Sequence, residues 1–340
     1  MSLTINDTRT KLPRIIQGGM ALYSSVGLAG PVALEGEIGV VAITLLSQEE
    51  MILALGKARI EAKGNGLVGV NIMAADKHVE ERLENALLTK MVDVVIQGAG
   101  VTKAVPRICN KYGVSYFPII SRPAQVDFYS SHFDISGFVY EGAEAGGHIG
   151  NLEKTLFRKG DTTLEEIVDR AKEIPVYAAG GITPERVGEV LARGAYGIQI
   201  ATPCLLAVEC ALPVEVKEFY AKSGPEDLVL IDSPAGMPGR ALQNALTEGL
   251  ANRLWFSPKF FGLKKCTKCL KACKSRESEH MQSFCIRGSL IFARDGNLDY
   301  GLFFSGKEIG YWNEFTTVKN IINLYRERIN EFIKTRSASL

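Results

Sequence analysis

The chain has 340 residues, 46% of them hydrophobic, and its formal net charge at pH 7 is +1. That balance offers no basic field for a nucleic acid, and no apolar run approaches the roughly 18 residues of a membrane span, so we expect neither partner. The first residues lack the apolar segment of a signal peptide, and an odd count of seven cysteines does not suggest a secreted disulfide framework, so we expect a cytoplasmic protein.

Eight short apolar segments, rich in β-branched and aromatic residues, are predicted to be strands. In chain order they cover 14–20, 38–43, 67–73, 92–100, 114–120, 136–140, 175–182 and 195–202. Helical segments alternate with them. One begins at the capping box formed by Ser47 and Glu50 and runs to about Ala62.

Eight strands that alternate with helices predict right-handed crossovers and a parallel sheet. Eight such units close into an α/β structure, a (β/α)8 barrel. An open, doubly wound sheet is the alternative, but its G-x-G-x-x-G fingerprint is approached only weakly, by Gly98 and Gly100. We expect residues 1–225 and 300–340 to form the barrel with a terminal helix over 315–333. Residues 226–299 would form a lid and a cysteine-rich insert.

Glycines gather at the ends of several predicted strands, where a barrel binds its ligand. The segment EGAEAGGHIG, residues 141–150, places His148 beside paired glycines, and a histidine on such a loop can exchange protons near neutral pH. Gly180, Gly181 and Thr202 end the last two strands and supply backbone donors and a hydroxyl. These are the groups that a phosphate-bearing cofactor needs.

The motifs QGGM, GVNIM, GAEAGGHIG, AAGGI and GIQIAT, in this order and spacing, resemble the FMN-dependent nitronate monooxygenases, formerly called 2-nitropropane dioxygenases. The same barrel family includes the FMN-dependent enoyl-ACP reductases. The resemblance covers about residues 13–210 and implies FMN as cofactor and His148 as the catalytic histidine. At the position of Ala201 the family usually has glycine. The residues implied to bind the flavin or its phosphate are Gly19, Met20, Asn71, Glu141, Ala145, Gly146, Gly147, Gly180, Gly181, Ala201 and Thr202.

Two chemistries suit one histidine beside a flavin. The resemblance implies oxidation of alkyl nitronates or nitroalkanes, with His148 as acid or base. The alternative is an enoyl reductase that takes electrons from NAD(P)H and protonates its substrate through His148. A third hypothesis is a flavin protein that only transfers electrons and has no catalytic histidine.

Four cysteines form a C-x2-C-x3-C-x11-C pattern at Cys266, Cys269, Cys273 and Cys285. Such spacing is typical of a metal centre, either a 4Fe-4S cluster or zinc, and interleaved lysines would offset the charge of four thiolates. It is similar to the 4Fe-4S spacing of the dienoyl-CoA reductase and trimethylamine dehydrogenase group. The alternative is a lysine-rich surface loop with incidental thiols.

The Pro/Gly-rich segment 233–244 is predicted to be a loop that opens a helix and covers the active site. Its Arg240 would either meet a carboxylate or phosphate of the substrate or lie on the surface. The expected partners are a small-molecule substrate and, as an assembly, a second copy of the chain in a homodimer.

Overall fold

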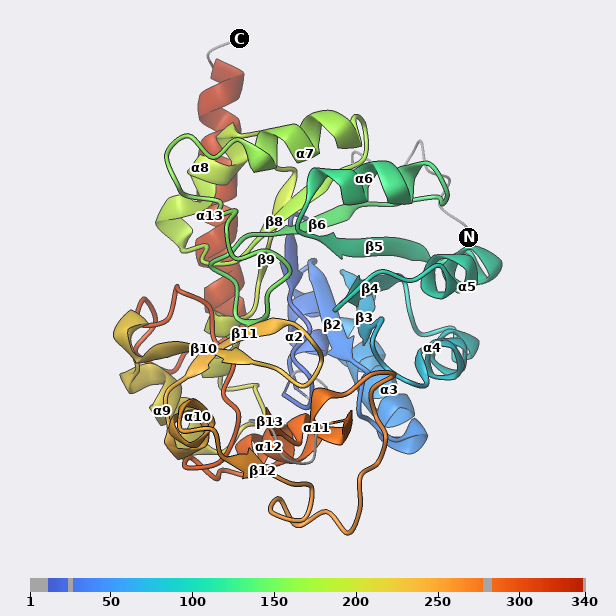
Figure 1. Cartoon of the computed structure of the whole chain (residues 1–340). Helices are drawn as coiled ribbons and strands as arrows, with labels where there is room; N and C mark the ends of the chain where they lie inside the picture. The colour runs from blue at the N-terminus through green and yellow to red at the C-terminus, as the bar shows by residue number, and fades with distance from the viewer. Residues whose placement is uncertain (1–11, 24–26, 278–282, 339–340) are drawn as a thin grey trace.

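The computed structural model describes residues 12–23, 27–277 and 283–338, and its centre is a closed barrel of eight parallel strands (Figure 1). The barrel confirms the predicted (β/α)8 architecture, and neighbouring strands follow the order of the chain. The strands are β1 Ile15–Gln17, β2 Ile38–Ala42, β3 Leu67–Met73, β4 Val94–Gly98, β5 Ser115–Ile120, β6 Phe138–Glu141, β8 Val176–Ala179 and β9 Gly197–Ile200.

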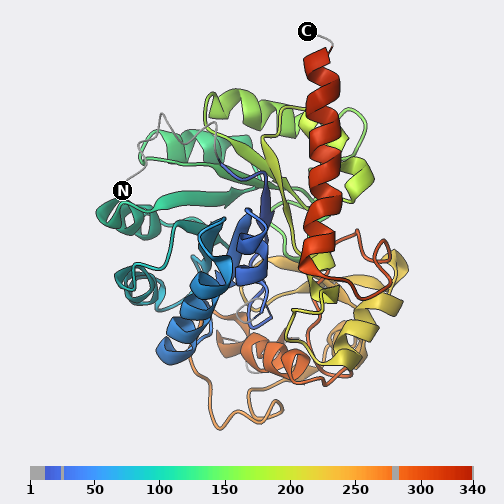
Figure 2. The same cartoon turned by 180° about the vertical axis from the view of Figure 1, so that it is seen from behind.

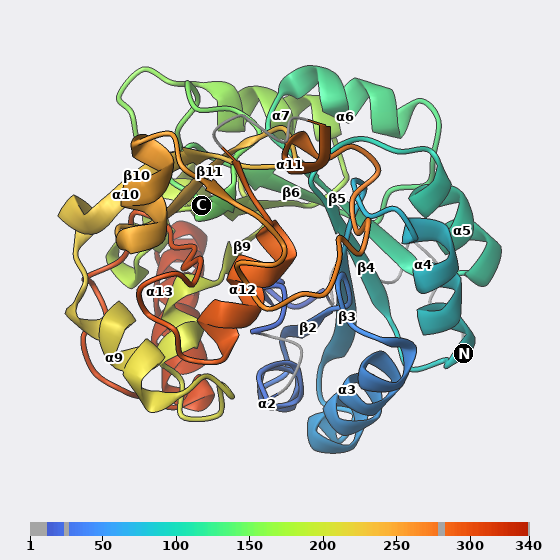
Figure 3. The ribbon, with the colours of Figure 1, turned by 60° about the horizontal axis from the view of Figure 1, so that its bottom comes forward.

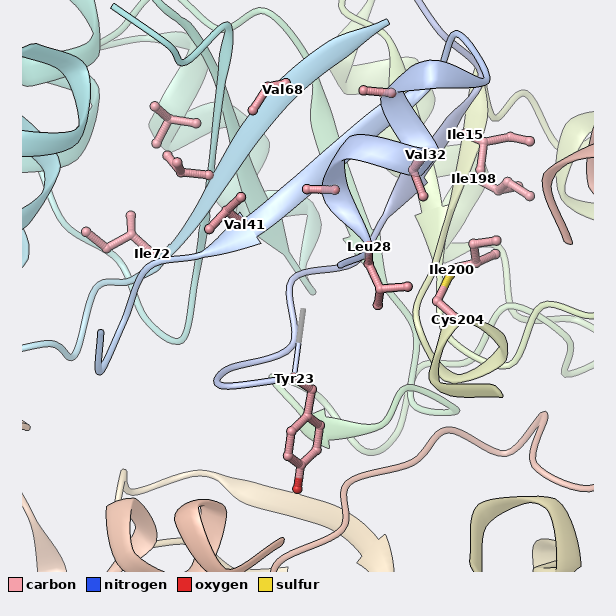
Figure 4. Close-up of a cluster of buried hydrophobic side chains, with 14 of the residues drawn as sticks. Ile15, Tyr23, Leu28, Val32, Val41, Val68, Ile72, Ile198, Ile200 and Cys204 are labelled. Carbon is pink, nitrogen blue, oxygen red and sulfur yellow. The ribbon is translucent and has the colours of Figure 1, made fainter. Parts of the chain in front are cut away.

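Side chains alternate between the inside and the outside of the barrel, as the two-residue period of a strand requires. The interior is filled by large apolar side chains such as Ile16, Val40, Phe117 and Tyr177. The outward residues form a larger core between the strands and the helices, and Figure 4 shows part of it, with Val41 of β2 and Val68 and Ile72 of β3 among the labelled residues. Because both faces are buried, these strands appear in the sequence as nearly continuous apolar runs.

Helices cover the outside of the barrel. They are α2 Ala29–Leu34, α3 Gln48–Ala62, α4 Val79–Leu88, α5 Ala104–Tyr112, α6 Pro123–Ser130, α7 Thr163–Ala171 and α8 Val187–Ala192. The predicted capping box is present on α3, where Ser47 and Glu50 bond each other's backbone N–H groups. The long C-terminal helix α13, Val318–Ala338, packs against α8 and α2 on the wall of the barrel (Figure 2).

Residues 226–299 lie mainly at one end of the barrel, shown in yellow to orange in Figure 3. A sheet joins β10 Leu228–Asp232, β11 Pro238–Leu242 and β7 Gly147–His148, so the histidine strand pairs with this region rather than with the barrel. The other elements are α9 Val214–Lys222, α10 Ala245–Ala251, β12 Trp255–Phe256, α11 Lys274–Glu277, β13 Ser283–Phe284 and α12 Ile286–Arg294, with short 3-10 turns at Pro184–Arg186, Thr202–Leu206 and Pro225–Asp227.

Segment 233–244 opens a helix as predicted, because α10 begins directly after it with Asn244 as N-cap, but its residues 238–242 form strand β11 instead of loop. A second apolar core supports this region and includes Ile231, Leu246, Phe256 and Leu290. The domain limits at 225 and 300 stay a prediction. Among the described residues, no helix has both the length and the apolar content needed to span a membrane.

Candidate active site

A cavity lies at the carboxyl ends of the barrel strands and holds about 1480 Å³ of space, counted out to its open mouth. Its wall is completed from the second core by Leu270, Ile286 and Leu290. The structure brings together at this cavity the predicted residues Gly19, Met20, Asn71, Glu141, Ala145, Gly146, Gly147, His148, Gly180, Ala201 and Thr202. Gly181 lies directly behind it, next to Gly180.

His148 is held from two sides. Its strand β7 pairs with β11, opposite Gly239, and its ring lies 5.4 Å from that of Phe304. Its Nε2 is 2.7 Å from the hydroxyl of Ser233, which is fully buried in the turn between β10 and β11. Loss of solvent lowers the pKa of His148 to about 4. The imidazole is therefore neutral at neutral pH.

Glu141 ends β6 and faces the same cavity. Burial raises its pKa to about 7, although a 3.2 Å hydrogen bond from the N–H of Gly150 and the charge of Arg240 act in the opposite direction. The cavity thus contains a neutral histidine and a carboxyl group that changes charge near neutral pH.

Arg240 is not among the described residues that line the cavity. It lies on β11 with 6% of its surface exposed, and its Nη1 donates to the carbonyl oxygens of Ala143 and Ala145, each at 2.6 Å. The guanidinium therefore holds the glycine turn that precedes His148. No local pattern indicates this contact, because its partners are about 100 residues away and are backbone atoms.

Two close approaches explain why glycines stand at the strand ends. Gly180 has a φ of +101°, and a Cβ there would lie 2.8 Å from the nitrogen of Ala145. A Cβ on Gly146 would overlap the backbone at Ser305 and Gly306. Replacement of either glycine would push apart the loops that line the cavity.

Gly181, Thr202 and Gly306 form a small cradle of donors at the end of β8 and β9. The carboxylate of Glu308 occupies it: Thr202 and the N–H of Gly181 bond this group, and the N–H of Gly306 donates to the Thr202 hydroxyl at 3.1 Å. Burial raises the pKa of Glu308, and its Oε2 is buried without a partner among the described residues. Sequence analysis missed Glu308 because it lies far along the chain from the cradle.

The donors of the cradle already bond a carboxyl group, and donors of this kind are what a flavin phosphate needs, so the residues predicted to hold the phosphate fit that group. A further polar atom in the cavity wall, the Oε1 of Gln199, is buried and accepts no hydrogen bond among the described residues. Buried acceptors are usually paired, so Gln199 is available to a donor on a bound ligand. The sequence did not single it out.

The four clustered cysteines lie together on the second core but not as a metal centre. Cys269, Cys273 and Cys285 pack against its apolar residues, whereas Cys266 is exposed. Burial, together with the neighbouring thiols, raises the pKa of Cys285 to about 11. In the part of the chain that the structure describes, no three His, Cys, Asp or Glu side chains are grouped to hold a metal ion. The structure therefore does not support the predicted centre.

A barrel that carries a glycine-lined anion cradle and a buried histidine at its carboxyl end defines a class of enzymes that bind a phosphate-bearing ligand there. The family model described as nitronate monooxygenase matches residues 64–326. This chain belongs to the nitronate monooxygenase family and is an oxidoreductase.

Known proteins of this kind differ in their substrates. The chain is 25% identical over 329 residues to an octahydroindene carboxyl-CoA dehydrogenase of Rhodococcus jostii, covering 91% of this chain and 90% of that one. It is 23% identical to a probable nitronate monooxygenase of Staphylococcus haemolyticus, over 69% of this chain and 76% of that one. The structure of FabK from Thermotoga maritima superposes with a TM-score of 0.79 and 24% identity, over 99% and 98% of the two chains. That last likeness shows the fold alone.

Proposed function

We propose that this protein is an FMN-dependent oxidoreductase that acts on the carbon chain of an acyl thioester, with NAD(P)H as its electron donor and His148 beside the reacting carbons. Bound FMN would supply the hydride chemistry. Gly180, Gly181, Thr202 and Gly306 would hold its phosphate, and Gly19, Met20, Asn71 and Gly146 would lie along its ring.

The charge of the cavity is the observation that carries the choice of substrate. No lysine or arginine is among the described residues that line it, and its ionisable groups are Tyr23, Glu141, His148 and Glu308. A nitronate is a small anion, and a site for it would be expected to place a positive charge nearby. An apolar cavity with a neutral histidine suits a neutral acyl chain better.

His148 would act on the proton of the reaction. In the reductive direction an enoyl thioester gains a hydride at its β-carbon and a proton at its α-carbon, and NAD(P)H becomes NAD(P)+. In the proposed tautomer the Ser233 hydroxyl donates to Nε2, and the ring proton stands on Nδ1. That N–H, or a water molecule that it orients, would deliver the proton while Nε2 takes the proton of Ser233, so the ring would stay neutral and solvent would then reprotonate the hydroxyl.

The R. jostii relative supports this proposal, since its name describes a CoA thioester, and it matches a larger share of the chain than the staphylococcal protein does. The second candidate is oxidation of an alkyl nitronate by the flavin, with the same histidine as acid or base. It is favoured by the family to which the chain belongs.

The deciding experiment follows the flavin absorbance of anaerobic protein. We expect NADH or NADPH to bleach the flavin, an enoyl-CoA to restore its colour, and an alkyl nitronate to leave it unchanged. Bleaching by the nitronate alone would establish the monooxygenase chemistry instead. If His148→Ala turned over every active substrate at the parental rate, the acid or base role of His148 would be rejected.

The proposed reaction does not use the cysteines. A metal centre at Cys266, Cys269, Cys273 and Cys285 stays a prediction, and iron and zinc analysis of anaerobically purified protein tests it. Absence of both metals would reject it.

A further inference from the structure

The segment between α10 and α11 is strongly basic. Residues 253–276 contain eight lysines and arginines and no acidic residue, although the net charge of the whole chain is only +1. The rest of the chain is therefore acidic, with a net charge of −7. The basic residues are Arg253, Lys259, Lys264, Lys265, Lys268, Lys271, Lys274 and Arg276.

Three of these basic residues make hydrogen bonds or ion pairs within the fold. Lys271 donates through Nζ to the carbonyl of Ala74 at 2.9 Å, Lys274 pairs with Asp232 at 2.7 Å, and Arg276 bonds the carbonyl oxygens of Leu270 and Lys271. Lys264, Lys265 and Lys268 differ, because they are exposed and no ion pair or hydrogen bond of their ammonium groups is found among the described residues. We call these three the free lysines.

The segment that carries the free lysines reaches the cavity at its next residues. Leu270, two residues after Lys268, lines the cavity wall and pairs with Asp76 in the loop after β3. The carbonyl of Cys269 also accepts from the N–H of Lys77 at 3.0 Å, so the loop is fixed to the rim of the barrel. Figure 3 shows this orange segment at that end of the molecule.

Exposed aromatic side chains accompany the charge. Trp255 is 41% exposed and its indole N–H donates to Ser275 at 3.4 Å, which places the ring next to the end of the basic segment. Phe260 is 44% exposed. A planar base can stack on such a ring, and ammonium groups beside it can neutralise phosphates.

We propose that the free lysines bind the phosphate groups of an adenine nucleotide whose reactive end enters the cavity. CoA, as the carrier of an acyl thioester, and NADPH both have this chemistry, and both carry a phosphate on the adenosine ribose. The cavity itself has no lysine or arginine among its described lining residues, so phosphates would be retained outside it while an uncharged end reaches His148. The inference rests on the proposed function for the identity of the two nucleotides.

The test is anaerobic calorimetric titration of FMN-loaded protein whose flavin has first been reduced with dithionite, so that NADPH and NADH bind without turnover. The ligands are CoA, 3′-dephospho-CoA, pantetheine, NADPH and NADH, at low and at high salt. The variant Lys264→Gln/Lys265→Gln/Lys268→Gln removes three charges but keeps the side-chain length. The control Lys63→Gln/Lys90→Gln/Lys172→Gln removes three exposed charges that follow helices α3, α4 and α7 at the opposite end of the barrel.

We expect the first variant to bind CoA or NADPH about tenfold more weakly and to lose most of the salt dependence, while pantetheine binds as before. The control variant should bind all ligands as the parent does. If only the affinity for CoA falls, the lysines bind the carrier of the thioester. If only the affinity for NADPH falls, they bind the electron donor.

Unchanged affinity for both nucleotides would overturn the inference, and so would an equal loss in the control. Binding of only an acidic carrier protein at these lysines would also overturn it. The outcome is separate from the flavin experiment: lysine-dependent CoA binding without any reoxidation of the flavin would reject the proposed reaction and leave the nucleotide site standing.

Discussion

At the scale of single residues, the position and orientation of His148 depend on three other side chains. Ser233 fixes the ring of His148, Arg240 fixes the turn before it, and Phe304 packs against it. Burial keeps His148 neutral. A neutral, oriented imidazole can hold a proton at one nitrogen while it accepts a hydrogen bond at the other.

Ser233→Ala should slow proton delivery without harming the flavin. We expect the rate of flavin reoxidation by an enoyl thioester to fall about tenfold, because this factor corresponds to the free energy of one lost hydrogen bond. The rate of flavin reduction by NAD(P)H should not change. Stopped-flow absorbance separates the two steps. Ser233→Thr, which keeps the hydroxyl, should recover most of the rate, and Ser131→Ala on the surface is the control. An equal fall in both steps would indicate a general structural defect.

Glu308 places a negative charge where a phosphate is expected. Glu308→Gln should therefore bind FMN at least about fivefold more tightly, since two like charges at close range repel by about 1 kcal/mol or more. Quenching of FMN fluorescence on titration of flavin-free protein measures this. Glu80→Gln, an exposed site on α4, should change nothing. Weaker binding in Glu308→Gln would mean that the carboxyl supports the cradle instead.

At the scale of elements, α13 supports the barrel next to the cradle. It follows residues 303–310, which reach the cavity, and packs between α8 and α2. Tyr325 of α13 is fully buried and its hydroxyl donates to the carbonyl of Ile182 at 2.8 Å, directly after the glycine pair at 180 and 181. The last helix of the chain thus holds a strand end of the active site.

Tyr325→Phe should lower the free energy of unfolding by about 1 kcal/mol, because the carbonyl of Ile182 loses its partner in a buried place. Urea denaturation measures the change. Tyr311→Phe removes a hydroxyl that bonds Glu185 on the surface and should cost much less. Equal effects of the two substitutions would contradict the supporting role of α13.

At the scale of the whole molecule, the cavity lies between two cores. The barrel supplies the glycines and Glu141, and the second core supplies Ser233, Arg240 and the apolar wall. β7 joins them, because it follows a barrel strand yet pairs with β11. Burial of Glu141 between the two parts has a consequence for the stability of the fold.

Stability should depend on the charge of Glu141. Its folded pKa, about 7, lies above its ordinary value, so the folded state binds the proton more tightly and loses stability as pH rises from about 4.5 through 7. Glu141→Gln cannot ionise. We therefore expect its melting temperature to rise relative to the parent between pH 5 and pH 8, as measured by calorimetry at about unit intervals. A constant difference would show that Glu141 does not titrate in this window.

The sequence alone determined the barrel and the position of its histidine loop. Apolar strand segments, helix caps and glycines are local patterns, and each strand end follows from the chain itself, so His148 and the glycine pairs could be placed at one end of the barrel. The tertiary structure decided the partners. Ser233 reaches His148 across 85 residues, Arg240 bonds backbone atoms nearly 100 residues away, and Glu308 enters a cradle built about 100 residues earlier. Such contacts depend on how the second core closes over the barrel, which no local pattern records. For the same reason the cysteine spacing predicted a metal centre, whereas the fold packs three of those cysteines against apolar side chains.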